Sequence, residues 1–423
     1  MSAQQGKGWR GTILAGLANY IDAGSIVAMG STFALWKALY GLDDNLLGII
    51  AAFSANGIGA GVGALVGGRL CDLFGRKKIY QYDMLFYAFG MLFLVFATAP
   101  WMIITGSLLV GLAVGADIPA SWSLIAEQAP DKKRGAHSGV AQLLWYLGPV
   151  MVLVAFFAID LMGWGIIGAR VVFGHLAVLA IALTFLRSKM AESERWEEAK
   201  AQRIAEAGAP RQSDWAKLFQ PQYLKSMVYL ILMYGLWNLW AGTNGIFMPL
   251  LLETAGGLPR WVAALLPAAY FAIGIVSILF VFMALSDKMN QRSLFALAAA
   301  MQVVGMALPA IFGLSLEIAI IHIVIMGFAA GFGAQSFFQL WSAEMFPTAI
   351  RATAQGLTFA VVRIALGIWT FIVPALASAD YQTLAWILTA FLAASGIIGT
   401  IWAPRNEGKS LEQLDAERQA KAA

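Results

Sequence analysis

Three ionisable side chains lie inside long apolar stretches of the sequence, where a charge is costly and is usually retained for function. Asp22, Asp117 and Arg363 each stand roughly 15–18 Å along a helix from a charged loop residue, at 1.5 Å per residue. A carboxyl group at that depth can bind and release a proton, and a guanidinium can bind a carboxylate, phosphate or sulfonate. The pattern predicts a mid-membrane site for a proton and a polar or acidic solute.

We expect Asp22, supported by Asp117, to carry a coupling proton and Arg363 to bind the substrate. Two other interpretations stay open. Asp22 and Asp117 can be structural residues bonded to backbone or neighbouring polar groups. Arg363 can form an internal salt bridge with Asp22 or Asp117, and a substrate can compete for that same guanidinium.

A second set of charged residues occurs twice, about half the chain apart. The pattern Glu-x-x-Pro-x-x-x-Arg runs from Glu127 to Arg134 and again from Glu344 to Arg351. Asp72, in the segment Gly-Arg-Leu-Cys-Asp-Leu-Phe-Gly-Arg-Lys, has its counterpart in Asp287. The repetition indicates a duplicated unit.

The elements that must position these residues are membrane helices. Of the 423 residues, 60% are hydrophobic and only 12% are charged, which is outside the range of soluble domains. Apolar stretches long enough to cross a bilayer predict an all-α membrane protein with twelve transmembrane helices in two six-helix bundles, at 11–40, 46–67, 79–98, 101–126, 138–158, 167–187, 224–252, 261–285, 293–312, 317–343, 354–376 and 382–403.

The same pattern sets the expected domain organisation and orientation. It divides the chain into a first bundle, a linker, a second bundle and a tail, at 1–187, 188–223, 224–403 and 404–423. Most of the 28 Lys and Arg residues fall in alternate loops, and basic loops stay in the cytoplasm. We therefore expect both termini to be cytoplasmic, in a bacterial inner membrane.

These motifs resemble those of the major facilitator superfamily, in particular its sugar porter branch and the related organic-ion carriers. The resemblance covers nearly the whole chain, including Glu192-Ser-Glu-Arg195-Trp and Pro404-Arg-Asn-Glu-Gly-Lys-Ser-Leu-Glu412. It implies alternating access between the two halves. It also implies a cytoplasmic gate of charged residues, formed by Asp72, Arg76, Glu127, Arg134, Glu192, Arg195, Asp287, Arg292, Glu344 and Arg351. A simpler interpretation is that these charges only hold the membrane orientation.

The resemblance also bears on the expected site. Proton-coupled sugar porters have an acidic residue at the position of Asp22, but Ser107 stands where their fourth helix carries an arginine. Amide side chains suit hydroxylated ligands because they both donate and accept hydrogen bonds. We expect substrate contacts, in addition to Arg363, from Gln142, Asn238, Asn244, Gln335, Gln339, Trp237 and Trp341; the tryptophans can equally be packing residues.

Other chemistries have little support. Cys71 is the single cysteine, the three histidines lack metal-ligand spacing, and no phosphate-binding Gly-rich loop is present. We expect no metal, no cofactor, no nucleic acid and no enzymatic activity. The expected partners are a small-molecule substrate, a proton and the lipid bilayer, with the chain acting as a monomer.

The leading functional hypothesis is a proton-coupled symporter that imports a sugar, polyol, sugar acid or related organic anion. A proton-driven exporter or exchanger of organic ions is the second hypothesis, although only Gly148-Pro149 remains of the exporters' fifth-helix signature. A ligand-sensing, carrier-like receptor is the third.

Overall fold

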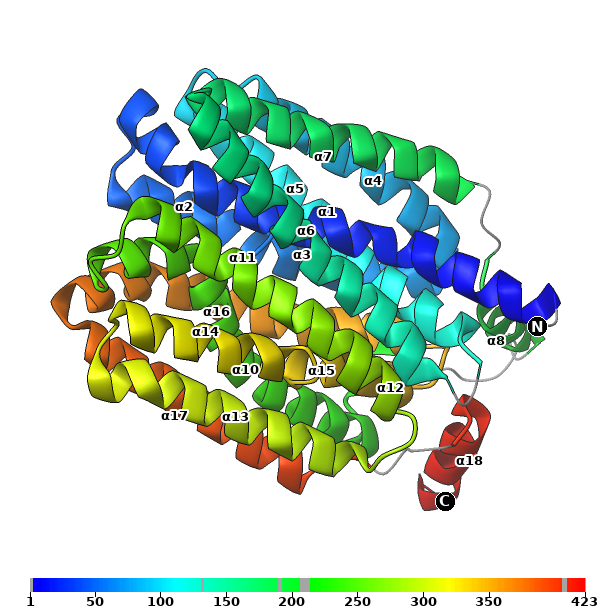
Figure 1. The fold of residues 1–423 in the computed structure, drawn as a ribbon. Coiled ribbons are helices and arrows are strands. Elements are labelled where there is room, and N and C mark those ends of the chain that lie inside the picture. The colour runs from blue at the N-terminus through cyan, green and yellow to red at the C-terminus, as the bar shows by residue number, and fades with distance from the viewer. Residues whose placement is uncertain (1–2, 131–132, 189–191, 206–213, 405–408, 423) are drawn as a thin grey trace.

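The computed structural model describes residues 3–130, 133–188, 192–205, 214–404 and 409–422 as a bundle of long helices in two halves. Figure 1 shows the first half, α1–α7, packed side by side with the second half, α10–α17. Parts of the predicted linker and of the tail motif, at 189–191, 206–213 and 405–408, lie outside the described residues.

The first half contains α1 (Ala3–Tyr40), α2 (Asp44–Phe53), α3 (Ile58–Phe74), α4 (Arg76–Val95), α5 (Pro100–Gln128), α6 (Arg134–Met162) and α7 (Gly165–Ser188). Between the halves are α8 (Glu194–Ala205) and α9 (Asp214–Leu218). The second half contains α10 (Pro221–Thr254), α11 (Arg260–Ser277), the π-helix η1 (Ile278–Phe282), α12 (Met283–Leu285), α13 (Gln291–Phe312), α14 (Leu316–Ala330), α15 (Ala334–Glu344), α16 (Arg351–Ala379) and α17 (Tyr381–Ile401). The tail forms α18 (Leu411–Ala422).

Ten stretches of the described residues are long and apolar enough to cross a membrane. The helices α4 and α10 take the two remaining places in the bundle (Figure 1). α4 is the less apolar of these because it opens with Arg76, Lys77 and Lys78 and carries Asp83 further along. The prediction of an all-α fold with twelve helices in two bundles is confirmed.

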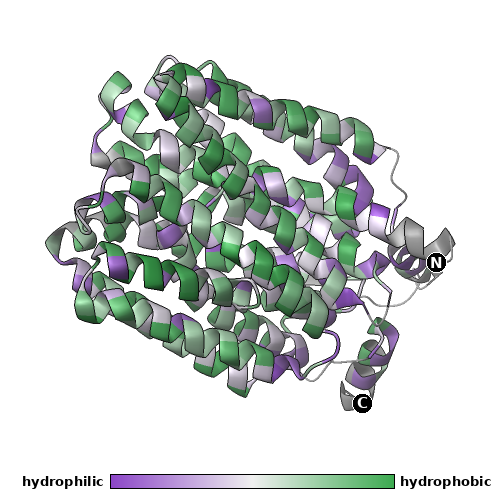
Figure 2. Ribbon diagram, in the orientation of Figure 1, coloured by the Kyte–Doolittle hydropathy of each residue, from purple (hydrophilic) through white to green (hydrophobic). Residues whose placement is uncertain are grey.

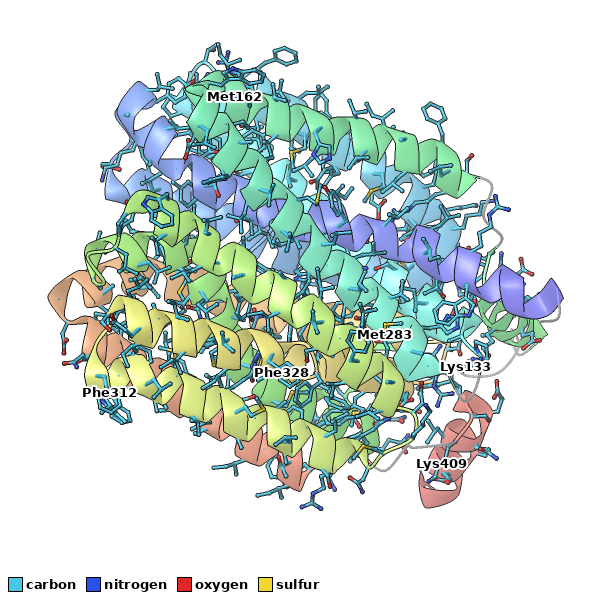
Figure 3. The ribbon with its side chains drawn as sticks, viewed as in Figure 1. Lys133, Met162, Met283, Phe312, Phe328 and Lys409 are labelled. Carbon is cyan, nitrogen blue, oxygen red and sulfur yellow. The ribbon has the colours of Figure 1, made fainter. Side chains whose placement is uncertain are left out.

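Both termini, α8 and α18 lie at one end of the bundle, which we call the linker end. Hydrophilic residues gather there in Figure 2, whereas the helices between the two ends are mostly hydrophobic. In Figure 3, Lys133 and Lys409 mark the linker end, and Met162 and Phe312 mark the opposite end, which we call the short-loop end. Short polar side chains begin several helices at the short-loop end; Asp43, for example, accepts a hydrogen bond from the Leu46 N–H at 2.7 Å.

Three of the membrane-crossing segments are interrupted inside the bundle. The second segment, predicted as one span at 46–67, breaks at residues 54–57 between α2 and α3. The tenth, predicted at 317–343, breaks at residues 331–333 between α14 and α15, and the eighth passes through η1. Broken helices at mid-membrane expose backbone groups only where they line a cavity or contact protein, which marks such places as candidate sites.

The two halves approach most closely where α3 meets α16. Gly68 lies against the Ala352 carbonyl, and Gly356 lies against the Ala64 carbonyl, so that a side chain at either glycine would collide with the facing backbone. Glycine is needed here for close approach rather than for backbone freedom. This contact holds α3 and α16 together next to the linker end.

Candidate functional site

A cavity of about 830 Å³ of space not filled by protein lies between the two halves. The first half contributes residues of α1 and α6 and the break before α3, and the second half contributes residues of α10, α11, α14, α15 and α16. The α10 stretch from Trp237 to Met248 supplies the largest share of its wall. A cavity between the two halves is the expected location of a transporter's small-molecule site.

The cavity wall carries polar atoms that have no hydrogen-bond partner within the described protein. They are the Nε1 atoms of Trp237 and Trp240, Oδ1 of Asn238, Nε2 of Gln335 and Nε of Arg363. All five residues are buried. Since buried polar groups are almost always satisfied, this group of atoms indicates that a polar ligand or water completes the site.

Arg363 lies in the cavity wall and is only 3% exposed. Its Nη1 donates to Oδ1 of Asn56 at 2.9 Å, and its guanidinium carbon lies 4.7 Å from the ring centre of Phe359. Among the described residues, no carboxylate lies within ion-pair distance of Arg363. Its charge is therefore not neutralised by either predicted partner, Asp22 or Asp117.

Asn56 is a site residue that the sequence did not indicate. It stands in the break between α2 and α3, and its Nδ2 donates to the Gly242 carbonyl of α10 at 3.4 Å. Its Oδ1 accepts from Arg363 on α16, so one amide of the first half bridges two helices of the second half. The break allows this because a continuous helix would have fixed Asn56 on the α3 surface.

The other predicted substrate residues divide into two groups. Trp237, Asn238, Asn244 and Gln335 line the cavity, and Oε1 of Gln335 accepts from the Tyr234 hydroxyl at 2.7 Å. Gln142 and Gln339 lie outside its wall and bond to each other across the halves at 2.8 Å. Trp341 also lies outside it and donates to Gln291 at 2.6 Å. Their roles in substrate binding stay predictions.

Asp22 is fully buried in α1, next to the cavity-lining Ala23. Neither of its carboxylate oxygens has a hydrogen-bond partner among the described residues. The charged groups around it include Asp117, Arg187 and Asp83 of the same half. Asp22 thus belongs to a set of buried charges of the first half.

Asp117 has a partner that the sequence analysis missed. Arg187, at the end of α7, donates through Nη1 to Asp117 Oδ1 at 3.0 Å and lies 3.7 Å from Asp83 Oδ1. The Arg187 guanidinium also covers the Tyr80 ring at 3.4 Å. Asp83 lies inside the predicted span 79–98, so it could have been found as Asp22 was, as an ionisable residue within an apolar stretch. Arg187 is the last residue of the predicted span 167–187, where a basic residue is expected to orient the helix in the membrane.

At the linker end the two Glu-x-x-Pro-x-x-x-Arg motifs exchange partners. Arg351 of the second half donates to Glu127 of the first at 2.8 Å, and Arg134 of the first donates to Glu344 of the second at 3.0 Å. Arg76 adds a bond to Glu127 at 3.0 Å and one to the Thr348 carbonyl at 2.9 Å. These side chains are at least nine-tenths buried, so the linker end is closed.

The repeated aspartates also join the halves. Asp72 pairs with Arg76 at 3.0 Å and accepts from the N–H and hydroxyl of Thr353 at 2.7 and 2.6 Å. Asp287 accepts from the N–H groups of Gly135 and Ala136, at the start of α6, at 2.9 and 3.0 Å. Burial raises the pKa of the Asp287 carboxyl, and the two N–H bonds partly oppose that shift.

The remaining predicted gate residues lie at the margin of this network. Glu192 accepts from the N–H groups of Arg76 and Lys77 at 3.2 and 3.0 Å, at the start of α4. Arg195 pairs with Glu412 of the tail at 3.1 Å near the surface. Arg292 is exposed and has no ion pair among the described residues. That the set acts as a gate stays a prediction.

A second cavity, of about 1500 Å³, lies between α1, α2, α6, α10 and α11 toward the short-loop end. Its wall continues along α1 and α10 from the central wall, because Gly30 follows Val27 and because Ile246 and Phe247 lie between Gly245 and Met248. The central site is therefore closed at the linker end, and the second cavity lies on its short-loop side.

Residues 31–417 match the family model described as "Sugar (and other) transporter". This chain belongs to the sugar porter branch of the major facilitator superfamily. The matching region includes both Glu-x-x-Pro-x-x-x-Arg motifs, α16 and every residue of the central cavity wall except Ala23, Ile26 and Val27 of α1.

Similar curated proteins are sugar transporter family members of bacteria. The chain is 42% identical to the "Minor myo-inositol transporter IolF" of Bacillus subtilis, over 96% of this chain and 93% of that protein. It is 25% identical to the "Arabinose-proton symporter" of the same organism, over 95% and 93%. These sugar porters are multi-pass membrane transporters rather than enzymes, and so is this one.

Solved structures of sugar porters have the same fold. The proton:xylose symporter XylE bound to 6-bromo-6-deoxy-D-glucose superimposes with a TM-score of 0.83 at 17% identity, over 98% of this chain and 99% of that one. The inward open conformation of XylE from E. coli gives 0.69 at 17% identity, over 96% and 98%.

Proposed function

We propose that this sugar porter is a monomeric, proton-coupled symporter that imports a neutral polyol or sugar, with a cyclitol such as myo-inositol as the first candidate. The linker end is cytoplasmic in this proposal, because most Lys and Arg residues gather there. The conformation described above then faces outward, with the substrate entering through the second cavity.

The observation that carries the proposal is the group of unpartnered polar atoms in the central cavity. The indole N–H groups of Trp237 and Trp240 and the Gln335 amide can donate, and Asn238 Oδ1 can accept. A ring with a hydroxyl on most carbons both donates and accepts on every side, which suits such a mixed set. The myo-inositol transporter at 42% identity supports this substrate class.

Proton coupling rests on Asp22. Its carboxyl group is buried beside the cavity and lacks a partner among the described residues, and a charge buried without a partner is strongly disfavoured. A proton on Asp22 removes that cost, so binding and release of the proton can accompany the change of conformation.

A second candidate substrate is an organic acid, which Arg363 favours. Its guanidinium faces the cavity, and its described side-chain partners, the Asn56 amide and the Tyr234 hydroxyl, are both neutral. A substrate carboxylate would form a charge-assisted bond there. The neutral substrate is preferred because the other unpartnered cavity atoms match hydroxyl groups.

The test uses purified protein in liposomes. Uptake of radiolabelled myo-inositol is measured by counterflow and under an inward proton gradient, in competition with D-xylose, D-glucose, glucuronate and cis,cis-muconate. We expect counterflow of myo-inositol and its accumulation under the gradient. Transport of the two acids but not of the polyol or sugars would favour the second candidate substrate. Counterflow of myo-inositol without accumulation under the gradient would exclude proton coupling.

A further inference from the structure

A cluster of buried charges lies in the first half, outside the central cavity. We call it the acid cluster: Asp22 of α1, Asp83 of α4, Asp117 of α5 and Arg187 of α7. None of the four lines the central cavity wall, and the substrate proposal above does not use Asp83 or Arg187. Each residue is at least nine-tenths buried.

Asp83 and Asp117 approach the same nitrogen of Arg187. The Arg187 Nη1 lies 3.0 Å from Asp117 Oδ1 and 3.7 Å from Asp83 Oδ1, so the two carboxyl groups are neighbours in the closed cluster. Both oxygens of Asp83 and Oδ2 of Asp117 otherwise lack a donor among the described residues. Two ionised carboxylates offer only acceptors, so a bond between them exists only when one carries a proton.

The charge balance of the acid cluster leads to the same conclusion. Three carboxyl groups share one guanidinium, and Arg187 already donates to Asp117 at 3.0 Å. Arg187 is 3.7 Å from Asp83, too far for a good hydrogen bond. Burying two unpaired negative charges would cost several kcal/mol each, so the closed cluster is neutral only with protons on two of its carboxyl groups.

We propose that the Asp83–Asp117 pair, with Arg187 as its counter-ion, is a second proton site of this transporter, and that its proton is released when the linker end opens. This inference deepens the proposed function and depends on its proton coupling. Asp83 and Asp117 are the proton-binding groups, and Arg187 is a positioning residue.

Each element packed around the pair contributes a group that can change its proton affinity. α5 contributes Asp117, α7 contributes Arg187, and α1 contributes Asp22. On α4 itself, Tyr80 lies against Arg187, and α3 contributes the buried thiol of Cys71. Arg187 is thus the one cation acting directly on the pair in this part of the described chain.

The proton site and the closed linker end share their helices. Asp83 follows Arg76 by two turns of α4, and Asp117 precedes Glu127 by about three turns of α5, at 3.6 residues per turn. Arg76 and Glu127 are bonded to each other and to the second half. A change in how α4 packs on α5 is therefore transmitted to the bonds that close the linker end.

α7 makes a second connection between the two places. Arg187 ends the helix inside the acid cluster, and Glu192, five residues later, accepts bonds from the first N–H groups of α4. Loss of the proton leaves Asp83 and Asp117 both ionised. They then compete for Arg187 and repel each other, which favours separation of α4 from α5.

The experiment compares Asp83→Asn with Asp83→Glu and with Glu198→Gln, an exposed carboxylate of α8 that serves as the control. Each variant in liposomes is assayed for counterflow of radiolabelled myo-inositol and for its accumulation under a proton gradient. We expect Asp83→Asn to keep counterflow but to bring inositol only to equal concentrations on both sides. Asp83→Glu restores accumulation, and Glu198→Gln leaves both unchanged.

Two results overturn the inference. Accumulation by Asp83→Asn equal to that of the parent protein means that the pair carries no coupled proton. Loss of both counterflow and accumulation in Asp83→Asn and Asp83→Glu alike, with an unchanged unfolding temperature, assigns Asp83 a structural role.

Arg187→Lys and Arg187→Gln test the positioning role of Arg187. The Lys variant should keep accumulation with a shifted pH profile of counterflow, and the Gln variant should lose accumulation.

A substrate-independent measurement separates this inference from the proposed function. Infrared difference spectra of the purified protein at neutral pH report protonated carboxyl groups through their C=O stretch. We expect a band of a buried protonated carboxyl that Asp83→Asn weakens and Glu198→Gln does not. Absence of myo-inositol counterflow in the parent protein would exclude inositol as the substrate and leave the second proton site untouched. Absence of the infrared band would exclude the second proton site.

Discussion

The carboxylate of Glu127 and the guanidinium of Arg351 meet at 2.8 Å, although 224 residues separate them in the chain. Arg134 and Glu344 form the reciprocal pair at 3.0 Å. Each copy of the duplicated motif therefore supplies the carboxylate of one ion pair and the guanidinium of the other. Since both ion pairs span the two halves, opening the linker end would break both of them.

Removing Glu127 should open the linker end. Glu127→Gln breaks the buried ion pairs of Glu127 with Arg351 and Arg76, although Arg76 keeps its pair with Asp72. Breaking a buried ion pair costs about 3–5 kcal/mol. Cys71, the single cysteine, is fully buried and packs near Ala352 of the second half. We expect a membrane-permeant maleimide to alkylate Cys71 severalfold faster in this variant.

Arg195→Ala is the matched control for that measurement. Its pair with Glu412 is partly exposed, at 22% and 64% of the side-chain surfaces, and exposed pairs contribute about 1 kcal/mol or less. Alkylation of Cys71 should change little. Equal acceleration of alkylation in both variants would mean that burial does not determine how strongly an ion pair holds the linker end closed.

A side chain at Gly68 should prevent closure of the linker end. In Gly68→Val the new atoms would collide with the Ala352 carbonyl and with Gly356 of α16. We expect the transporter to remain open at the linker end, with fast alkylation of Cys71 and no counterflow. Gly174→Val serves as the control, because nothing lies within 4 Å of a Cβ there. Normal counterflow by Gly68→Val would show that α3 and α16 need not approach so closely.

Asp22→Asn should separate accumulation from exchange. The amide has nearly the same shape but carries no titratable proton, so uphill accumulation of myo-inositol is lost while counterflow continues. Uptake is followed in liposomes with and without a proton gradient. Unchanged accumulation would exclude Asp22 as a coupling residue, and comparison with Asp83→Asn shows which carboxyl the coupling needs.

Arg363→Ala should affect acidic solutes more than neutral ones. A hydrogen bond to a charged group is worth about 1.5–3 kcal/mol, so binding of glucuronate should weaken roughly ten- to hundredfold more than binding of myo-inositol. Competition against inositol counterflow measures both.

Asn56→Asp is the companion variant. It places a carboxylate where the present amide bonds Arg363 at 2.9 Å. The guanidinium is then neutralised without being removed, and we expect loss of acid binding with retention of the polyol. Parallel losses for acid and polyol in both variants would indicate that Arg363 acts through structure.

The fold could be predicted because composition, apolar length and two copies of a motif all specify the same architecture. The gate residues could be named from the same motifs, but their pairing could not. Glu127 and Arg134 stand within one segment, and nothing in the spacing indicates that each bonds the opposite copy.

The site was harder to predict because it depends on where helices break and how they rotate. Gly57, Gly331 and Gly333 do not differ in sequence context from glycines inside intact helices, so the placement of Asn56 could not be foreseen. Gln142 and Gln339 look like ligand amides, yet they bond to each other across the halves and lie outside the wall of the central cavity. Asp83, in contrast, was detectable as an acid within an apolar span.

The interruption at residues 54–57 divides the second transmembrane segment into two separate helices, α2 and α3. α3 is fixed against α16 by glycine contacts, and α2 packs on α16 as well while bordering the second cavity near Gly48. We expect this joint to let α2 move over a solute at the short-loop end while α3 stays in place, so that entry and release of the solute are separate steps.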